Sequence, residues 1–388
     1  MTETDDIIGM DTPFYLYDID LLRRTLRKVC DNAARYGFFV HYALKANFDP
    51  RILQENRSFG LGTDCVSGGE VRASVEAGFD PAGIVFAGVG KRDDEIEYAL
   101  EKGIFAFNCE SLEELEVIDG IAGKSGRHAR VALRINPDVD PHTHKNISTG
   151  QADSKFGIAY TEIEEAIERI GSLGNISIVG LHFHIGSQIL NLKVYEYLCN
   201  RVVSTISWFE EHGVGITYVN VGGGLGINYE SPRTEPIPDF DAYFGIFAEK
   251  LPLRAGQTLH FELGRSIVAQ CGSLITKVLY NKKTASGKNY ILTDASMTEL
   301  IRPALYGAHH HIDNLTPHDG TQVYSIAGGV CESSDIFARD MKMPVTRRGD
   351  YLALRSAGAY GQSMASCYNM RPLPRSVYYV DGAVEKSI

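Results

Sequence analysis

Short apolar runs alternate with amphipathic stretches over the first two thirds of the chain. The runs are rich in aromatic and β-branched residues, which favours β-strands. Eight of them cover residues 38–44, 61–66, 83–88, 104–109, 130–135, 178–185, 217–222 and 258–263. The stretches between them, such as "SGGEVRASVEAG" and "RDDEIEYALEKG", carry apolar residues near i, i+3 and i+4 and end in glycine, as amphipathic helices do. Strict alternation of strand and helix predicts right-handed crossovers and a parallel sheet.

The number of these units predicts the fold class. Eight units in about 240 residues predict an α/β fold built on a (β/α)8 barrel, because both the count and the length match. After residue 270 the sequence pattern changes: strand-like runs now follow one another, joined by Gly, Asn and Asp turns. Examples are "KNYILTD", "DYLALRS" and "SVYYVDG". This pattern predicts an antiparallel β-domain. The opening run "PFYLYD" is also strand-like, so we predict that residues 1–20 add a strand to that β-domain, that 21–270 form the barrel and that 271–388 form the β-domain.

Composition and charge narrow the possible partners. The formal net charge of -11 disfavours binding to nucleic acid or to an anionic membrane, because such surfaces need clustered Lys and Arg. The first residues, "MTETDDIIGM", lack the basic and apolar regions of a secretory signal, and no apolar run reaches the roughly 18 residues of a membrane span. Seven scattered cysteines without a C-x-x-C pair support neither a disulfide framework nor a zinc ribbon. We expect a cytoplasmic protein that binds a small molecule.

Polar residues stand where several of the predicted barrel strands end. Lys45 follows the first run, Asp64 lies near the end of the second, and His184 near the end of the sixth. Glu262 lies in the eighth run, with Arg265 three residues further on. Because chemistry in such barrels takes place at the C-terminal ends of the strands, we expect these side chains to share one rim. Each alone also has an ordinary explanation: a lysine that reaches past a strand end, a carboxylate that caps a helix, or a hydrogen-bonded core histidine.

A glycine run at 222–224, extended by Gly226, follows the seventh strand. It would place consecutive backbone N–H groups at a turn from strand to helix, which suits a phosphate; the alternative is a tight turn without a ligand. The run does not match G-x-x-x-x-G-K-[ST], and Ile227 occupies the last position of G-x-G-x-x-G, so a nucleotide is not implied. Arg265 could add a charge-assisted bond to the same phosphate.

A phosphate site, a lysine and a carboxylate on one barrel rim suggest pyridoxal 5'-phosphate. The Lys45 amine must be neutral to attack an aldehyde, whereas the pKa of free lysine is about 10.4, so a desolvated position behind an apolar strand is chemically useful. Glu262 would keep the pyridine nitrogen protonated, which makes the ring a strong electron sink. His184, between two apolar neighbours, could lie flat on the ring.

Motifs along nearly the whole chain resemble those of the fold-type III pyridoxal-phosphate decarboxylases, whose barrel and β-domain are similar to those of alanine racemase. In chain order they include "YALKAN", "DCVSGGE", "NPDVDPHTHKNISTG", "SKFGI", "HFHIGSQI", "VGGGLGI", "ELGR", "MTELIRPALYGAHH", "CESSD" and "GAYGQSMASCYNMRP". They are most similar to those of the members that convert meso-2,6-diaminopimelate into L-lysine and CO2, the last step of lysine biosynthesis. The resemblance implies this reaction, at the D centre of the substrate, with pyridoxal 5'-phosphate as cofactor and no metal.

The same resemblance implies a role for each matching residue. Lys45 would bind the cofactor covalently, His184 would stack on it, and Glu262 would pair with the pyridine nitrogen. The other cofactor contacts would come from Asp64, Ser187, Gly223, Gly224, Gly264, Arg265 and Tyr360. The substrate would be bound by Arg265, Arg302, Tyr306, Glu332 and Tyr360.

The distal end of this substrate carries a carboxylate beside an ammonium. Such an end needs a cation and an anion held close together, which Arg302 and Glu332 could supply. The alternative for Arg302 is an ordinary salt bridge between domains. Cys331 would be catalytic and return a proton to the carbon that loses CO2, a step that a water could also perform. The alternative for Cys331 is a small buried hydrophobe. In the family this cysteine comes from the partner subunit, which implies a homodimer with active sites shared across the interface.

Two positions depart from the family pattern. Leu263 stands where the family usually has proline in "EPGR", and Gly329 often corresponds to a proline before "VCESSD". Because proline stiffens a turn, these changes would loosen the loop that positions Glu262 and Arg265 without removing a functional group.

Other functions remain possible. The pair His182 and His184, together with "HHH" at 309–311, could indicate a metal-dependent barrel hydrolase, although no further His or Asp ends the neighbouring strands at ligand spacing. A racemase shares the cofactor and plan, but racemases do better with an arginine than with a glutamate at the pyridine nitrogen. A catalytically dead regulatory chain would be expected to lose Lys45 or the phosphate ligands. Carboxynorspermidine, ornithine and arginine remain alternative decarboxylase substrates.

Overall fold

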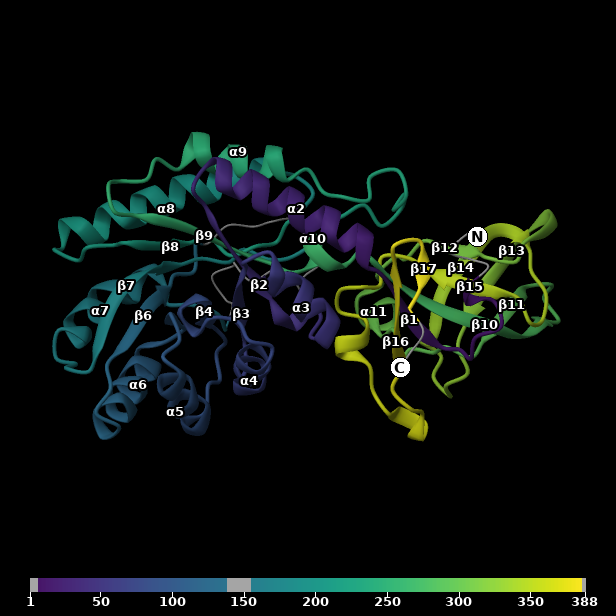
Figure 1. Cartoon of the computed structure of the whole chain (residues 1–388), viewed down its shortest axis with the longest axis horizontal. Helices are drawn as coiled ribbons and strands as arrows, with labels where there is room; N and C mark the ends of the chain where they lie inside the picture. Colours follow the sequence, from purple (N-terminus) through teal and green to yellow (C-terminus); the bar gives the residue numbers. More distant parts are fainter. Residues whose placement is uncertain (1–5, 138–154, 386–388) are drawn as a thin grey trace. The chain divides into compact units, whose positions relative to one another are not determined.

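The chain folds into two compact units. The computed structural model describes residues 6–137 and 155–385. The barrel unit comprises Leu26–Gly226 and Asp239–Gly264, and the β unit comprises Met1–Thr25, Ile227–Pro238 and Arg265–Ile388. Figure 1 shows the two units, with each element labelled. The motif "NPDVDPHTHKNISTG" at 136–150 lies almost entirely outside the described residues.

Eight parallel strands close into a barrel, as the alternating pattern predicts. They are β2 (Phe39–Ala43), β3 (Gly62–Cys65), β4 (Ile84–Phe86), β5 (Ala106–Cys109), β6 (Ala129–Arg134), β7 (Ile176–His182), β8 (Tyr218–Asn220) and β9 (Thr258–Leu263). The last pairing, β2 with β9, sets His41 opposite Glu262 and Tyr42 opposite Leu263. The predicted (β/α)8 barrel is therefore confirmed, and every strand lies within three residues of its predicted bounds.

Helices lie outside the barrel strands, between consecutive strands in the chain (Figure 1). They are α3 (Pro50–Ser58), α4 (Gly68–Glu76), α5 (Asp93–Lys102), α6 (Leu112–Lys124), α7 (Ile163–Ile170), α8 (Lys193–Glu211) and α9 (Phe240–Lys250); α2 (Ile19–Arg35) precedes the first barrel strand. Their ends carry sequence-encoded caps. The Ser67 and Ser111 side chains accept hydrogen bonds from the backbone at the starts of α4 and α6, and Gly103 ends α5 in the left-handed conformation.

The β unit contains a nine-stranded sheet. Its strands are β1 (Phe14–Asp18), β10 (Gly272–Lys283), β11 (Asn289–Thr293), β12 (Ile312–Asn314), β13 (His318–Ala327), β14 (Ile336–Val345), β15 (Tyr351–Leu354), β16 (Arg375–Val380) and β17 (Ala383–Val384). Two short helices, α10 (Arg265–Val268) and α11 (Arg302–Tyr306), belong to the same unit.

This sheet is mixed rather than wholly antiparallel. Most ladders are antiparallel, but β1 pairs with β16 and β11 pairs with β13 in parallel. The reason is topological, because both parallel pairs join strands that are separated by long connections, which a hairpin cannot produce. The other side of β1 pairs with β10, so the N-terminal strand lies in the interior of the sheet. Phe14 and Leu16 of β1 pack with Ile275, Tyr351 and Val377 in the core of this unit.

None of the helices within residues 6–137 and 155–385 combines the length and the apolar character that crossing a bilayer requires.

Two buried histidines form a pair on β2 and β9 of the barrel. His41 Nε2 lies 2.9 Å from His260 Nδ1, and His41 Nδ1 lies 3.0 Å from the Gly83 carbonyl oxygen. The His260 ring also stacks on Phe39 and Phe105. Burial, followed by the neighbouring His41, lowers the pKa of His260 to about 2, and burial likewise lowers the pKa of His41. Both rings are therefore neutral in the folded barrel at ordinary pH.

This pair makes the barrel sensitive to acid. The unfolded chain binds a proton at each histidine below a pH of about 6.5, whereas the folded chain does not, so stability falls as the pH drops. Each histidine contributes about 1.4 kcal/mol per pH unit in this range. We expect unfolding at pH 5 to have its midpoint at a lower urea concentration than unfolding at pH 7.5. The difference between the two midpoints should be smaller in the double variant His41→Gln and His260→Gln. An identical pH slope in the two proteins would contradict this assignment.

Candidate active site

Lys45 and Asp64 form an ion pair at the C-terminal ends of β2 and β3. A single 3-10 turn, Leu44–Ala46, ends β2 and carries Lys45. The register of the two strands sets Ala43 opposite Asp64, so the Lys45 Nζ atom comes to 2.9 Å from Asp64 Oδ2. Asp64 is fully buried, and its second oxygen, Oδ1, accepts no hydrogen bond from the described residues. Burial and the charge of Glu262 raise the pKa of Asp64, and Lys45 opposes both effects.

The Lys45 side chain is less buried than its position in the sequence predicts. About a third of it, 34%, is exposed, although Leu44 and Ala46 on either side are buried. The apolar run therefore fixes the backbone, while the amine itself reaches the end of the barrel. There it is open to solvent and lies 2.9 Å from the Asp64 carboxylate.

Three donors hold the Glu262 carboxylate inside the barrel. The side-chain amides of Asn220 and Asn108 donate to Glu262 Oε1 at 2.7 and 3.2 Å. His182 Nε2 lies 3.1 Å from Oε2 and must donate there, because a carboxylate only accepts. Burial alone would raise the pKa of Glu262, but His182, Lys45 and His184 together hold it below its usual value. Glu262 is therefore a buried carboxylate that stays ionised.

Asn220 also connects Glu262 to the glycine run. Its side-chain oxygen accepts the Gly222 N–H at 2.8 Å, while its amide donates to Glu262 and to the Tyr218 hydroxyl. Sequence reasoning missed Asn108, Asn220 and His182 as partners of Glu262. The available signal was a polar residue inside each of three otherwise apolar strands, which has to find a hydrogen-bond partner when it is buried.

The glycine run at 222–224 needs the absence of side chains. A Cβ atom on Gly222 would lie 2.5 Å from His184 Nδ1, one on Gly223 would lie 1.9 Å from the Glu262 carbonyl oxygen, and one on Gly224 would lie 2.6 Å from that of Gly186. Gly222 and Gly224 also adopt φ values of +69° and +100°, which side chains disfavour. The backbone of the run therefore passes directly against β9 and His184.

Two of the three N–H groups in this run are used inside the protein. Gly222 donates to Asn220, and Gly223 donates to His184 Nδ1 at 3.3 Å. No helix follows directly, because the next one, α9, begins only at Phe240. The expected row of free N–H groups at a helix start is thus replaced by a loop in which the Gly222 and Gly223 N–H groups already have partners.

A second loop lies beside Gly224. Ile189 donates to the Gly224 carbonyl oxygen at 2.9 Å and accepts from the Gly226 N–H at 3.0 Å, which brings the loop after β7 next to the glycine run. This loop carries Ser187. On the other side, Gly264 allows the end of β9 to approach the segment with Lys45, because a Cβ on Gly264 would lie 2.8 Å from that of Ala46.

His184 is neutral at this end of the barrel. Its Nδ1 accepts the Gly223 N–H, which fixes the tautomer on this side of the ring. Burial, and after it the cations Arg134 and Lys45, lower the pKa of His184 well below its ordinary value. A flat, uncharged ring of this kind can lie against an aromatic ligand.

The β unit holds two of the predicted arginines in one aromatic cluster. The Arg265 guanidinium donates to the Tyr229 hydroxyl at 2.6 Å and lies over the Tyr360 ring, 4.8 Å from its centroid. Arg302 lies over the Tyr229 ring, also 4.8 Å from the centroid. Tyr229 thus links the two guanidinium groups. Sequence reasoning missed it, because a tyrosine in a loop at 227–238 has no periodic pattern to reveal its partners.

Arg302 is buried with part of its guanidinium unsatisfied. It is 5% exposed, and its Nε has no hydrogen-bond partner among the described residues. Burial, and the like charge of Arg265, lower the pKa of Arg302, while Tyr229 opposes them. A buried guanidinium with an unpaired N–H group is a costly arrangement that an anion would relieve.

The remaining predicted residues are Tyr306, Glu332 and Cys331, which are all more exposed than Arg302. Tyr306 is on α11, one helical turn after Arg302, and is half-buried. Cys331 and Glu332 lie on an exposed loop, where the Tyr368 hydroxyl donates to Glu332 Oε1 at 2.9 Å. The interpretation of Cys331 as a buried hydrophobe is therefore wrong. Gly329 donates its N–H to Ser296 Oγ at 2.9 Å, a bond that proline could not make, and Leu263 is buried in β9.

Among the described residues, no group of three or more His, Cys, Asp or Glu side chains is arranged to hold a metal ion. His182 is instead committed to Glu262, and His310 contacts Arg302.

Comparisons with known proteins point to one family. Residues 20–269 match the family model described as "Pyridoxal-dependent decarboxylase, pyridoxal binding domain". A diaminopimelate decarboxylase from Bacteroides thetaiotaomicron is 51% identical over 372 residues, which cover 96% of this chain and 96% of that protein. Another, from Zymomonas mobilis, is 43% identical over 94% of this chain and 87% of that protein. The crystal structure of diaminopimelate decarboxylase from Helicobacter pylori complexed with L-lysine superimposes with a TM-score of 0.91, at 38% identity, over 97% of this chain and 93% of that one.

The Glu262 cluster predicts the effect of one isosteric substitution. In Asn220→Asp a carboxylate oxygen replaces the amide that donates to Glu262, while the bond from Gly222 can persist. Repulsion between the introduced carboxylate and Glu262 raises the pKa of Glu262 and weakens the hydrogen bonds that orient it. We expect the affinity of the apoprotein for pyridoxal phosphate at pH 7.5 to fall about tenfold or more, as one lost charge-assisted bond requires. Fluorescence titration measures it, with the exposed-strand substitution Asn289→Asp as control; equal affinities would argue against this network.

Proposed function

Because the chain belongs to the diaminopimelate decarboxylase family of pyridoxal-dependent decarboxylases, we propose that it releases CO2 from the D centre of meso-2,6-diaminopimelate and leaves L-lysine. This reaction is the last step of lysine biosynthesis. The observation that carries the proposal is the pair of features at one end of the barrel: the amine of Lys45 beside Asp64, and the ionised Glu262 held by three donors.

The residues fit pyridoxal 5'-phosphate. The donor set contains one amine that reaches the barrel end, one buried carboxylate that stays ionised, and a neutral histidine ring. When bound, this cofactor supplies an aldehyde for amines and a cationic ring that takes up the electron pair left by departing CO2. Lys45 holds the aldehyde end of the cofactor, and Asp64 orients the Lys45 amine.

Glu262 holds a proton at the pyridine nitrogen. A low pKa keeps the carboxylate ionised, so it accepts from a ring N–H rather than donating to the ring. His182, Asn108 and Asn220 occupy its other lone pairs and fix its direction. His184 would stack on the ring, and its neutral state would avoid repulsion with a cationic ring.

The phosphate is assigned to backbone and side-chain donors. Gly224, Ser187 and Gly264 contribute from the barrel unit, where the pairing of Ile189 with the glycine run fixes the loop. Gly223 contributes by its lack of a side chain, because its N–H is donated to His184. Arg265 and Tyr360, whose side chains stack on each other, are the other phosphate ligands in this proposal.

The substrate is distinguished from simple diamines by its distal end. The L centre, which is retained in L-lysine, carries a carboxylate and an ammonium. Arg302 binds the carboxylate through the guanidinium that lacks a partner at Nε. Tyr306 and Glu332 bind the ammonium side, and Arg265 with Tyr360 also lie near the substrate. A decarboxylase of diamines without this carboxylate has no need of a buried Arg302.

The active unit is a homodimer in the cytoplasm. Cys331 and Glu332 are exposed on one loop, and Tyr368 contacts Glu332. Nearby in the sequence, Met370 is 96% exposed and Leu373 is 58% exposed, which fits burial against a second copy. Cys331 from the partner subunit returns a proton to the carbon that has lost CO2.

The role of Lys45 predicts a spectroscopic loss. Lys45→Ala removes the amine that anchors the cofactor, so the visible absorbance of the bound cofactor should disappear or shift to that of free pyridoxal phosphate, and turnover should be abolished. Absorbance spectra and CO2 release measure both effects. Lys288→Ala serves as the matched control, because the Lys288 side chain is about as exposed as that of Lys45 and also pairs with an aspartate, Asp340. Retention of the wild-type spectrum in Lys45→Ala would refute the anchor.

The role of Arg302 predicts a loss of substrate binding. Arg302→Ala removes a charge-assisted pair worth about 2 to 3 kcal/mol, so kcat/KM for meso-diaminopimelate should fall about 30- to 150-fold. The matched control is Arg233→Ala, because Arg233 makes an exposed ion pair with Asp313 in the same unit. CO2 release should be measured with diaminopimelate, lysine, ornithine and carboxynorspermidine. Unchanged kinetics in Arg302→Ala, or faster turnover of another substrate by wild type, would reject the assigned substrate.

A further inference from the structure

We propose that His310 is a positioning residue that fixes the direction of the Arg302 guanidinium while leaving its positive charge available for the substrate carboxylate. The carboxylate ligand rests on the proposed function; the arrangement of the two side chains does not. His310 belongs to the "HHH" run at 309–311, for which the sequence offered only a metal-site interpretation.

The hydrogen bonds of His310 determine its tautomer. Its Nδ1 lies 2.8 Å from the Arg355 carbonyl oxygen, which can only accept, so Nδ1 carries the proton. In the neutral ring, Nε2 is then an acceptor. The Arg302 Nη1 atom lies 2.9 Å from Nε2 and donates to it. The ring is 1% exposed, and burial, followed by the charge of Arg302, lowers its pKa to about 3, which keeps it neutral at working pH.

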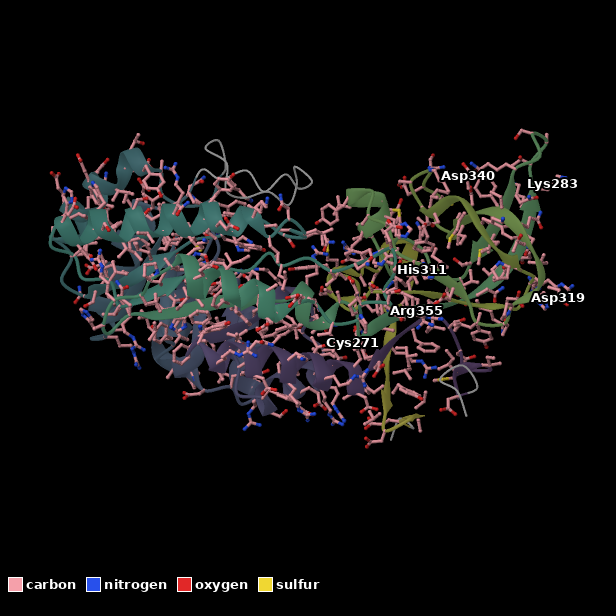
Figure 2. The ribbon with its side chains drawn as sticks, turned by 90° about the horizontal axis from the view of Figure 1, so that it is seen from above. Cys271, Lys283, His311, Asp319, Asp340 and Arg355 are labelled. Atoms are coloured by element: carbon pink, nitrogen blue, oxygen red, sulfur yellow. The ribbon has the colours of Figure 1, made fainter. Side chains whose placement is uncertain are left out.

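The sheet holds this histidine in place. Strands β12 and β15 pair with Ile312 opposite Leu354, and the Arg355 N–H continues the ladder to the His311 carbonyl oxygen at 2.8 Å. Figure 2 shows His311 and Arg355 beside each other in the β unit. The Arg355 side chain is itself bound to Asp313 at 2.8 Å. The carbonyl oxygen that orients His310 therefore lies on a fixed backbone.

Tyr229 limits Arg302 from another direction. The Arg302 guanidinium lies over the Tyr229 ring, and the same ring meets His310 edge to face at 81°, with the centroids 5.3 Å apart. Two constraints, a hydrogen bond at Nη1 and an aromatic face, thus hold the group in one orientation. The Nε atom is left without a partner among the described residues.

A neutral acceptor is the important feature of this arrangement. An aspartate or glutamate in place of His310 would also orient Arg302, but it would neutralise the guanidinium and compete with a substrate carboxylate. A histidine fixed in the neutral tautomer orients the cation and leaves its charge in place. Such preorganisation improves affinity because the ligand need not order the side chain.

Two substitutions separate the two hydrogen bonds of His310. In His310→Gln the amide oxygen can occupy the place of Nε2 and accept from Arg302. In His310→Asn the shorter side chain can donate to the Arg355 carbonyl oxygen but cannot reach Arg302. Both side chains are neutral and polar, so a difference between them reports the bond to Arg302 rather than burial of a polar group. His309→Gln is the control, because His309 is the preceding residue and its own side chain is 45% exposed.

The test compares two competitive inhibitors of the holoenzyme. L-lysine has the distal carboxylate, and pentane-1,5-diamine is the same molecule without it. The ratio of their inhibition constants therefore measures the carboxylate contact alone. We expect His310→Asn to reduce the preference for L-lysine about tenfold and to raise KM for meso-diaminopimelate more than it lowers kcat. His310→Gln and the His309→Gln control should stay within about threefold of wild type.

Other results would overturn the proposal in distinguishable ways. An unchanged ratio in His310→Asn, while Arg302→Ala abolishes the preference, would reject the role of His310 and retain the carboxylate at Arg302. An unchanged ratio in Arg302→Ala would reject the carboxylate contact, and with it the proposed substrate. Equal losses in His310→Gln and His310→Asn would indicate a purely structural role for the ring. If His310→Asn does not fold, a threefold or larger loss of preference in His310→Gln contradicts the proposal.

Discussion

The pairing of β2 with β9 is the constraint on which the catalytic end of the barrel depends. It closes the eight strands into a ring and sets His41 opposite Glu262 and Tyr42 opposite Leu263. The same closure fixes the turn that carries Lys45 against the end of β9, where Gly264 leaves no room for a side chain beside Ala46. Residues more than 200 positions apart in the chain thereby share one rim.

Closure also places two carboxylates, Asp64 and Glu262, in the interior of the barrel. Burial opposes the ionisation of both, and the charge of Glu262 further raises the pKa of Asp64. Only Asp64 has a lysine at ion-pair distance. Glu262 is held by hydrogen bonds from two amides and a histidine, which stabilise its charge and fix its direction. A carboxylate that remains ionised and oriented can hold a proton on a ring nitrogen, which a carboxylate in a tight ion pair does less well.

The β unit also contains a buried charge that hydrogen bonding orients, but this charge is positive. Arg302 is a buried cation that contacts a neutral histidine and an aromatic face, with its Nε unpartnered within the described residues. Arg302 is thus oriented by uncharged partners and keeps its positive charge. Burial of such a charge is costly, and an anionic ligand would lower that cost.

The sequence by itself determined the barrel, the order of its strands and the positions of Lys45, His184 and Glu262 near strand ends, because these features depend on local periodicity and on the termini of apolar runs. It also indicated the decarboxylase family through motifs spread along the chain. Only the tertiary structure decided which groups meet. The donors to Glu262 come from three different strands, two of the glycine N–H groups are used internally, Cys331 is exposed, and His310 contacts Arg302. Such partnerships join residues that are distant in the chain, and their hydrogen-bond directions follow from strand register and loop geometry, which local sequence patterns do not specify.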